Sequence, residues 1–291
     1  MGTDVFQTLA EAAGAAEEAA AEEGVDYEAI GGTELDADPL GVPTPPPPDL
    51  DEAMPAGGLA AGGPAVPEPA GMIRIDNLLG IPLLYQGDAL APKPTSFRLM
   101  PSFKPVLEAT VRQVQERAPA EFGSLDQIVS LGMFTAKPGA HGRAVANDWD
   151  RLRFTNLEIS PRNHEHNSPS LPKRQRYWAF AAICRSNSAF ILHGFYNSDH
   201  ENHIHQDTFG RLAFDTGSEA NVKLFQAVLN DIFGTTPKLD VDGDFGEKSR
   251  GALAKAQQRL GIAGNVTQDV ATMQKFLRAS GRLGFQLSVQ S

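Results

Sequence analysis

The sequence predicts an α+β protein made of one sheet domain followed by a smaller C-terminal bundle of three helices. Two observations predict the sheet domain: short apolar runs typical of buried strands lie among segments with helical spacing, and no regular strand–helix alternation connects them. A third observation predicts the bundle. Residues 218–280 contain three amphipathic segments that are separated by glycine-containing turns.

Residues 1–71 differ in composition from the rest of the chain. They hold 15 of the 36 acidic residues, 10 of the 21 prolines and no lysine or arginine. Such a segment buries too little apolar surface to offset the entropy of ordering it, so we predict a disordered acidic tail that ends in a proline-rich spacer. The remaining residues keep all 25 basic and the other 21 acidic side chains, a net charge of +4 that suits an anionic polymer as partner.

The sheet domain is predicted to span residues 72–212. Apolar side chains at helical spacing predict a helix over residues 103–114, which Pro119 and Gly123 then end. Further elements follow from short apolar runs: strands at residues 128–131 and 189–195, and a helix at residues 177–185.

Histidine and aspartate residues gather in two short segments of this domain. Residues 141–148 and 199–207 hold four of the seven histidines. Two imidazoles and one carboxylate on zinc, with water in the fourth position, form a common hydrolytic site. The metal lowers the pKa of that water to about 7 and polarises the carbonyl that is cut.

The spacing of the second segment can be compared with strand geometry. If residues 195–207 continue as a strand, His203 and His205 point to the same face, because side chains alternate with period two. His200 has the opposite parity and needs a bend to join them. The Asn and Ser residues just before it favour such a turn.

Three other histidines are given structural roles. His164 and His166 lie in a segment rich in proline and asparagine, so we expect solvated surface, with a secondary metal or substrate-rim role as the alternative. His193 lies inside an apolar run and is expected in the core. Cys184, the only cysteine, is expected to be a small buried apolar residue, and no intrachain disulfide can form.

The pattern His141-x6-Asp148 followed by His200-x2-His203-x-His205 resembles the extensin-like C-terminal family, which is similar to the zinc D-Ala-D-Ala metallopeptidases and the murein endopeptidases. The resemblance covers about residues 80 to 210. It implies a small antiparallel sheet with flanking helices and a Zn²⁺ ion held by His141, Asp148 and His205. It also implies that His200 is the general base and that His203 stabilises the developing oxyanion.

The chain departs from this family at three points. Gly139 stands where the family has serine, and Asn202 stands where many relatives have an acidic base, with Glu201 beside it. Several members carry an arginine that binds a substrate carboxylate. The nearest cations here are Lys137 and Arg143, which we therefore expect to bind substrate.

Residues 218–280 resemble the peptidoglycan-binding domain 1 family. The resemblance rests on the segments at residues 222–230 and 252–257 and on the turn Val-Asp-Gly-Asp-Phe-Gly at residues 241–246. Asp240, Asp242 and Asp244 suggest a calcium loop as an alternative, but Phe245 occupies the sixth position, where such a loop needs glycine.

Together these patterns predict a zinc peptidase that acts on bacterial peptidoglycan, either an endopeptidase or a D,D-carboxypeptidase. The alternative is a non-enzymatic wall-binding protein with a structural zinc. We expect no nucleic-acid partner and no membrane span. Since the N-terminus lacks the features of a secretory signal, we expect a protein made in the cytoplasm that reaches the wall as a phage endolysin or an injected effector, with the acidic tail as the handle for that machinery.

Overall fold

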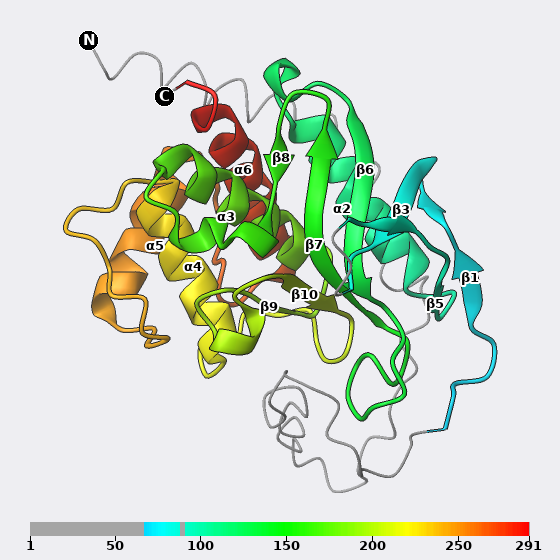
Figure 1. Cartoon of the computed structure of the whole chain (residues 1–291). Coiled ribbons are helices and arrows are strands. Elements are labelled where there is room, and N and C mark those ends of the chain that lie inside the picture. Colours follow the sequence, from blue (N-terminus) through cyan, green and yellow to red (C-terminus); the bar gives the residue numbers. More distant parts are fainter. Residues whose placement is uncertain (1–66, 88–90, 291) are drawn as a thin grey trace, which may run out of the picture.

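The computed structural model describes residues 67–87 and 91–290, and the predicted acidic tail lies almost wholly outside them. The chain folds into helices and a mixed sheet, which confirms the predicted α+β class (Figure 1). The strands are β1 (Ile73–Ile75), β2 (Asn77–Leu78), β3 (Ile81–Tyr85), β4 (Lys93–Pro94), β5 (Phe97–Leu99), β6 (Leu125–Gly132), β7 (Ala146–Phe154), β8 (Glu158–Ile159), β9 (Phe190–Leu192) and β10 (Ile204–Asp207). The helices are α2 (Lys104–Arg117), α3 (Leu171–Ser186), α4 (Glu219–Asp231), α5 (Glu247–Arg259) and α6 (Val270–Leu287), and the 3₁₀ turns are η2 (Ala120–Phe122), η3 (Pro161–Asn163), η4 (Glu165–Asn167) and η5 (Ser198–His200).

The main sheet has the order β2-β3-β6-β7-β10-β9, with β4 beside β3 and β8 beside β7. Its pairs are antiparallel except for β3 with β6, which run parallel. The purely antiparallel sheet that the family resemblance implies is therefore too simple a description. The parallel pair arises because a crossover that contains α2 returns the chain from β3 to β6 in the same direction.

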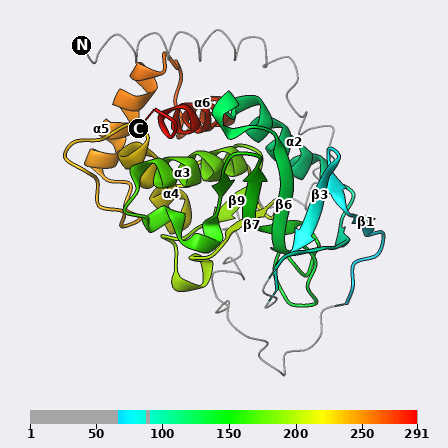
Figure 2. The same ribbon diagram turned by 45° about the horizontal axis from the view of Figure 1, so that its top comes forward.

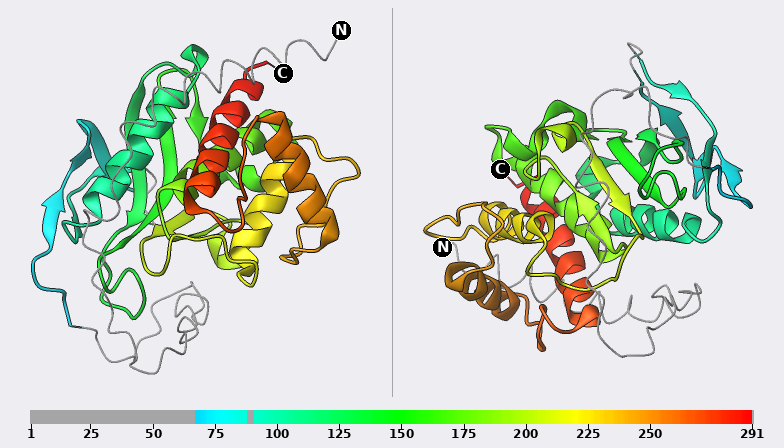
Figure 3. Two further views of the ribbon diagram at one scale, coloured as in Figure 1. Left: turned by 180° about the vertical axis from the view of Figure 1, so that it is seen from behind. Right: turned by 90° about the horizontal axis from the view of Figure 1, so that it is seen from below.

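Helix α3 lies between the sheet and α6 (Figure 2). Every residue from 177 to 186 is buried, so this part of the helix has no solvated face. A helical segment that is buried all round is stable only when it is enclosed, and here α2, α4 and α6 complete the enclosure. Seen from behind, α2 and α6 lie in front of the strands (Figure 3).

The predicted elements of the sheet domain occur with shifted bounds. Helix α2 and strand β6 extend the segments expected at residues 103–114 and 128–131, and α3 begins six residues before the expected helix, with Pro172 in its first turn. Strand β9 is shorter than expected because the chain leaves the sheet after Leu192. None of the helices within the described residues has the length and apolar character needed to cross a bilayer.

The C-terminal region, residues 218–290, contains the three expected helices, but α6 runs on to Leu287 and packs most closely on α3. Gln226 of α4 organises the glycine-containing turn, because its amide donates to Asp242 Oδ1 (2.8 Å) and accepts from the N–H of Gly243 (3.1 Å). One hydrophobic core runs without interruption through both regions.

The contact between α6 and α3 requires two glycines. A Cβ atom on Gly281 would lie 2.6 Å from Ile183 Cγ1, and one on Gly284 would lie 2.9 Å from Ala179 Cβ. Neither glycine has a positive φ, so close packing, and not the backbone, excludes a side chain: α3 lies against both glycines, and Ile232 also lies against Gly284.

We predict that Gly284→Ala destabilises the protein although alanine is the better helix former. The propensity gain of roughly 0.5–1 kcal/mol is smaller than the overpacking cost of about 1–3 kcal/mol. The control is Gly251→Ala on α5, where nothing lies within 4 Å of the new Cβ and a gain of about 0.5–1 kcal/mol is expected. Urea unfolding measures both variants, and equal stabilisation of the two would contradict the tight α3–α6 contact.

Candidate metal centre

Asp148 and His205 form a direct cross-strand pair. Asp148 lies on β7, His205 lies on β10, and the antiparallel register places their Cα atoms opposite each other. Their side chains meet on the sheet face away from the helices, where His205 Nδ1 lies 2.9 Å from Asp148 Oδ1. On the other face, Gln206 donates from its amide to Thr110 Oγ1 of α2 at 3.0 Å. Because side chains alternate along a strand, Gln206 points into the core and His205 points to the candidate centre.

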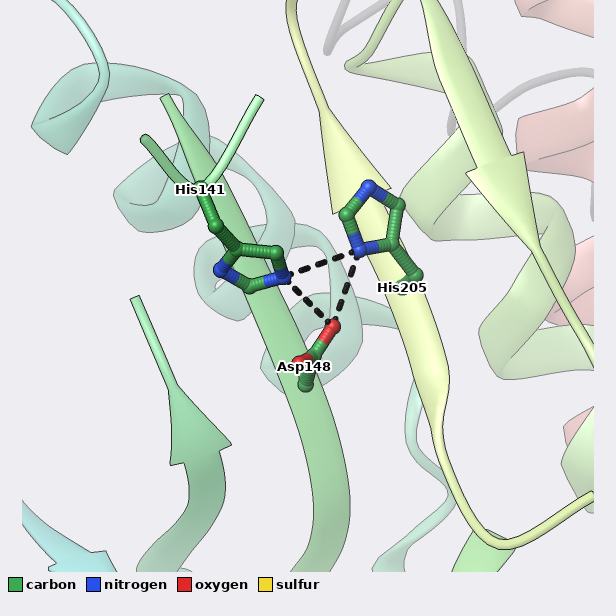
Figure 4. A group of neighbouring side chains, drawn as sticks. All are labelled: His141, Asp148 and His205. Atoms are coloured by element: carbon green, nitrogen blue, oxygen red, sulfur yellow. Dashed lines mark hydrogen bonds and ion pairs between the residues drawn. The ribbon is translucent and has the colours of Figure 1, made fainter. Parts of the chain in front are cut away.

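His141 reaches the same point from the loop between β6 and β7. Its Nε2 lies 3.1 Å from Asp148 Oδ1 and 3.2 Å from His205 Nδ1 (Figure 4). The loop turns tightly, since Gly139 has a φ of 98° and a Cβ on Gly142 would lie 1.8 Å from the carbonyl oxygen of Lys137. The positive φ of residue 139 favours glycine at this position.

The ligand atoms of His141, Asp148 and His205, here called the ligand triad, all lie within 4.8 Å of one another. Both imidazoles are buried, and Asp148 is partly buried. The triad could hold a metal ion, and among the described residues it is the one such group of histidine, cysteine and acidic side chains.

Acceptors outside the triad orient both imidazoles. The carbonyl oxygen of Met133, just past the end of β6, lies 2.6 Å from His141 Nδ1, and Asp207 Oδ2 lies 2.9 Å from His205 Nε2. Each outer nitrogen therefore donates, which leaves a lone pair on each inner nitrogen. Two such nitrogens and a carboxylate oxygen repel one another unless a cation or a proton lies between them. The donor set therefore fits a metal ion.

The charges of the triad are strongly coupled. Burial disfavours the charged form of Asp148, but His141 and His203 outweigh it and hold its pKa well below the ordinary value. Burial likewise lowers the pKa of His205, but the carboxylates of Asp148 and Asp207 more than offset it and raise that pKa to about 10. Without a metal, a proton on His205 supplies the positive charge of the site.

Two further histidines lie beside the triad. His200 belongs to η5, the bend that brings it back to the site, and its ring centroid is 6.2 Å from that of His205. His203 comes just before β10, and its Nε2 lies 3.6 Å from Asp148 Oδ1. Asparagine side chains orient both rings, because Asn197 Oδ1 accepts from His200 Nδ1 (2.6 Å) and Asn202 Oδ1 accepts from His203 Nδ1 (2.7 Å).

Burial, together with the charges of His203 and His205, lowers the pKa of His200 to about 2. Burial also lowers the pKa of His203, against the opposing charge of Asp148. Both rings are therefore neutral at pH 7, with a lone pair on Nε2.

Lys137 and Arg143, the expected substrate-binding cations, are exposed on the loop that carries His141. The positive charge of Lys137 contributes to the lowered pKa of His203, so this side chain lies near the centre. The guanidinium of Arg143 stacks over the ring of Phe209 at 4.2 Å. Neither cation forms an ion pair with a carboxylate in the part of the chain that the structure describes. Glu201 is half exposed, and its carboxylate lies 3.8 Å from His164.

The expectation that His164 and His166 lie on solvated surface is wrong for His166. His164 is exposed, but Glu165 and His166 are each only 3% exposed. The segment folds into η3 and η4 and packs on the chain that follows β9, a contact that local composition cannot reveal. His193 and Cys184 are buried, as expected.

Sequence reasoning missed the outer acceptors Asp207, Asn197 and Asn202. Asp207 could have been found, because it lies two residues after His205 and strand alternation places both on one face. The asparagines act through local turns, and the sequence offers no comparable signal for them.

No protein-family model, curated protein or solved structure matches the chain.

We predict that Asp207→Ala weakens zinc binding about 10- to 100-fold, because losing the outer carboxylate frees the ring of His205. Competition with a chromophoric chelator measures the affinity. The control is His164→Ala, an exposed histidine outside the triad that should leave the affinity unchanged. Equal affinities for all three proteins would show that the ion binds elsewhere.

We also predict that zinc binding releases about one proton below pH 10. A histidine with a raised pKa keeps its proton below that pKa, so the metal must displace the proton of His205, and the apparent affinity must rise with pH. Calorimetric titration in buffers of different ionisation enthalpy counts the protons. Removing Asp207 should lower both the pKa of His205 and the number of protons released. A binding enthalpy that does not depend on the buffer would refute the assignment of the proton to His205.

Proposed function

We propose that the protein is a zinc-dependent peptidase of bacterial peptidoglycan, either an endopeptidase or a D,D-carboxypeptidase, that hydrolyses bonds of stem peptides or cross-links. The observation that carries this proposal is the convergence of His141, Asp148 and His205 beside two more oriented histidines. Two nitrogens and one carboxylate oxygen are the donor set of many hydrolytic zinc sites.

His141, Asp148 and His205 would hold the zinc ion, which when bound would polarise the scissile carbonyl and lower the pKa of water. The protein's own groups prepare this chemistry. Asp148 stays ionised, and the contacts of His141 with Met133 and of His205 with Asp207 keep the inner nitrogens aimed at the ion. Because these orientations exist before substrate arrives, no reorganisation is needed during the reaction.

His200 is the proposed general base. Its Nδ1 donates to Asn197, so Nε2 is the nitrogen that accepts the proton lost by the attacking water. The same nitrogen then returns the proton to the amine that leaves.

His203 is the proposed stabiliser of the developing oxyanion. Its Nδ1 donates to Asn202, so it can donate toward the substrate only after Nε2 has taken up a proton. The carboxylate of Asp148 at 3.6 Å favours that uptake.

The C-terminal region supports peptidoglycan as the substrate through its resemblance to wall-binding domains. Tethering to an insoluble polymer raises the local concentration of cleavable bonds. Lys137 and Arg143 then offer positive charge to carboxylates of the substrate, at the edge of the metal centre. On this proposal the protein acts at the cell wall after secretion, injection or phage lysis.

One observation favours a second candidate, a non-enzymatic wall-binding protein with a structural zinc. His203 Nε2 lies close enough to Asp148 to join the triad as a fourth ligand after a small shift. Four protein ligands would close the coordination sphere, as in structural zinc sites.

The test is hydrolysis of purified peptidoglycan by the full chain, with and without chelator. We predict release of new amino groups that chelator abolishes and zinc restores, and mass spectrometry of the released muropeptides identifies the bond. His200→Ala should lower the rate about 10²- to 10⁴-fold while zinc binding stays intact. His164→Ala is the matched control, because its imidazole lies outside the centre.

One outcome would overturn the enzyme: bound zinc without hydrolysis of walls of several chemotypes would support the structural-zinc candidate. Hydrolysis that persists at full rate in His200→Ala would instead remove that residue from the mechanism.

A further inference from the structure

Gly194 and His166 are in unusually close contact. Gly194 follows β9 by two residues, and His166 lies on η4, 28 positions earlier in the chain. A Cβ atom on Gly194 would lie 2.2 Å from His166 Nδ1, so the imidazole occupies the space of a side chain at this position. Gly194 is not among the residues with positive φ, so only the imidazole ring, and not the backbone, requires glycine here.

The segment that carries His166 is firmly anchored on both sides. Glu165 Oε2 accepts from the backbone N–H of Ser160 at 2.9 Å, and its other oxygen lies 3.8 Å from the guanidinium of Arg176 on α3. Arg162 pairs with the fully buried carboxylate of Asp150 on β7. The segment that carries His166 is therefore fixed to both the sheet and α3.

A continuous set of contacts runs from His166 to His200. The ring of His166 meets Phe195 edge-on at 5.2 Å, and Phe195 stacks on Trp178 at 5.1 Å. The next residue, Tyr196, has its ring 5.8 Å from that of His200. The backbone N–H of Tyr196 also donates to the carbonyl of His193 at 2.8 Å, which closes a turn around Gly194.

The buried nitrogen of the His166 ring makes no hydrogen bond to the described residues that could hold the ring in place. Nδ1 is buried and has no hydrogen-bond partner among the described residues. Burial lowers the pKa of His166 to about 4, so the ring is neutral at pH 7. Its role is therefore steric: it determines where the chain turns between β9 and η5.

We infer that His166 is a positioning residue, which sets the place of His200 by packing against Gly194 and Phe195. This inference rests on the proposed function, in which His200 is the general base. His166 contacts none of the ligand triad in the structure, so it acts on the catalytic step and leaves the metal in place.

The test uses a double-mutant cycle in the full chain loaded with zinc. His166→Ala should lower kcat for peptidoglycan hydrolysis by about 10- to 100-fold, because small displacements of a catalytic group are costly. KM and zinc affinity should stay unchanged. His166→Phe keeps the ring and should retain most of the activity, which separates packing from any role of the nitrogens.

Gly194→Ala should also lower kcat, because the new methyl group collides with the imidazole. Combined with His166→Ala, it should recover activity relative to Gly194→Ala alone, since the space is then empty. Wild-type kcat in folded His166→Ala, or no recovery in the double variant, would overturn the inference. If His166→Ala does not fold, Gly194→Ala decides: a folded variant with wild-type kcat would refute the positioning role.

An inactive wild-type protein would refute the proposed function and leave the placement of His200 to be tested separately. The NMR signal of the His200 ring, assigned with His200→Gln, should shift in His166→Ala and return in His166→Phe. An unshifted signal would overturn the placement whatever the activity of the protein.

Discussion

The pairing register of β7 with β10 is the constraint on which the candidate metal centre depends. It places Asp148 opposite His205, and a slip of β10 by one residue would turn His205 toward the helices and away from Asp148. The core prevents this slip, because Gln206 accepts from Trp149 Nε1 at 2.7 Å and donates to Thr110 on α2. The packing that holds one face of the sheet thus determines the chemistry of the other face.

The sequence predicts those parts of the protein that depend on local periodicity. The strand expected over residues 195–207 is limited to Ile204–Asp207, yet His203 and His205 both lie on the side of Asp148, and the expected turn before His200 exists as η5. Helices α2 to α6 follow apolar spacing, so their existence was predictable and their ends less so. The approach of His141 depends on a loop, where spacing alone does not fix the geometry.

Burial that arises from distant segments could not be predicted. His166 lies in a segment whose composition is typical of a loop, yet it is buried, because Gly194 leaves space for its ring. The two residues are 28 positions apart, and neither position alone predicts the contact. The same limit applies to α6: its apolar spacing indicates a helix, but not that Gly281 and Gly284 place it on α3. Residues predicted as two domains therefore share one core.

The position of α6 on α3 has a consequence for biosynthesis. α3 supports the sheet that carries the ligand triad, yet one side of α3 is covered by residues that the ribosome adds about 100 positions later. Until α6 has left the exit tunnel, that apolar side is open to solvent and to chaperones. The nascent chain therefore cannot complete its core before α6 has been translated, because until then α3, which packs on the sheet, lacks one of its packing partners.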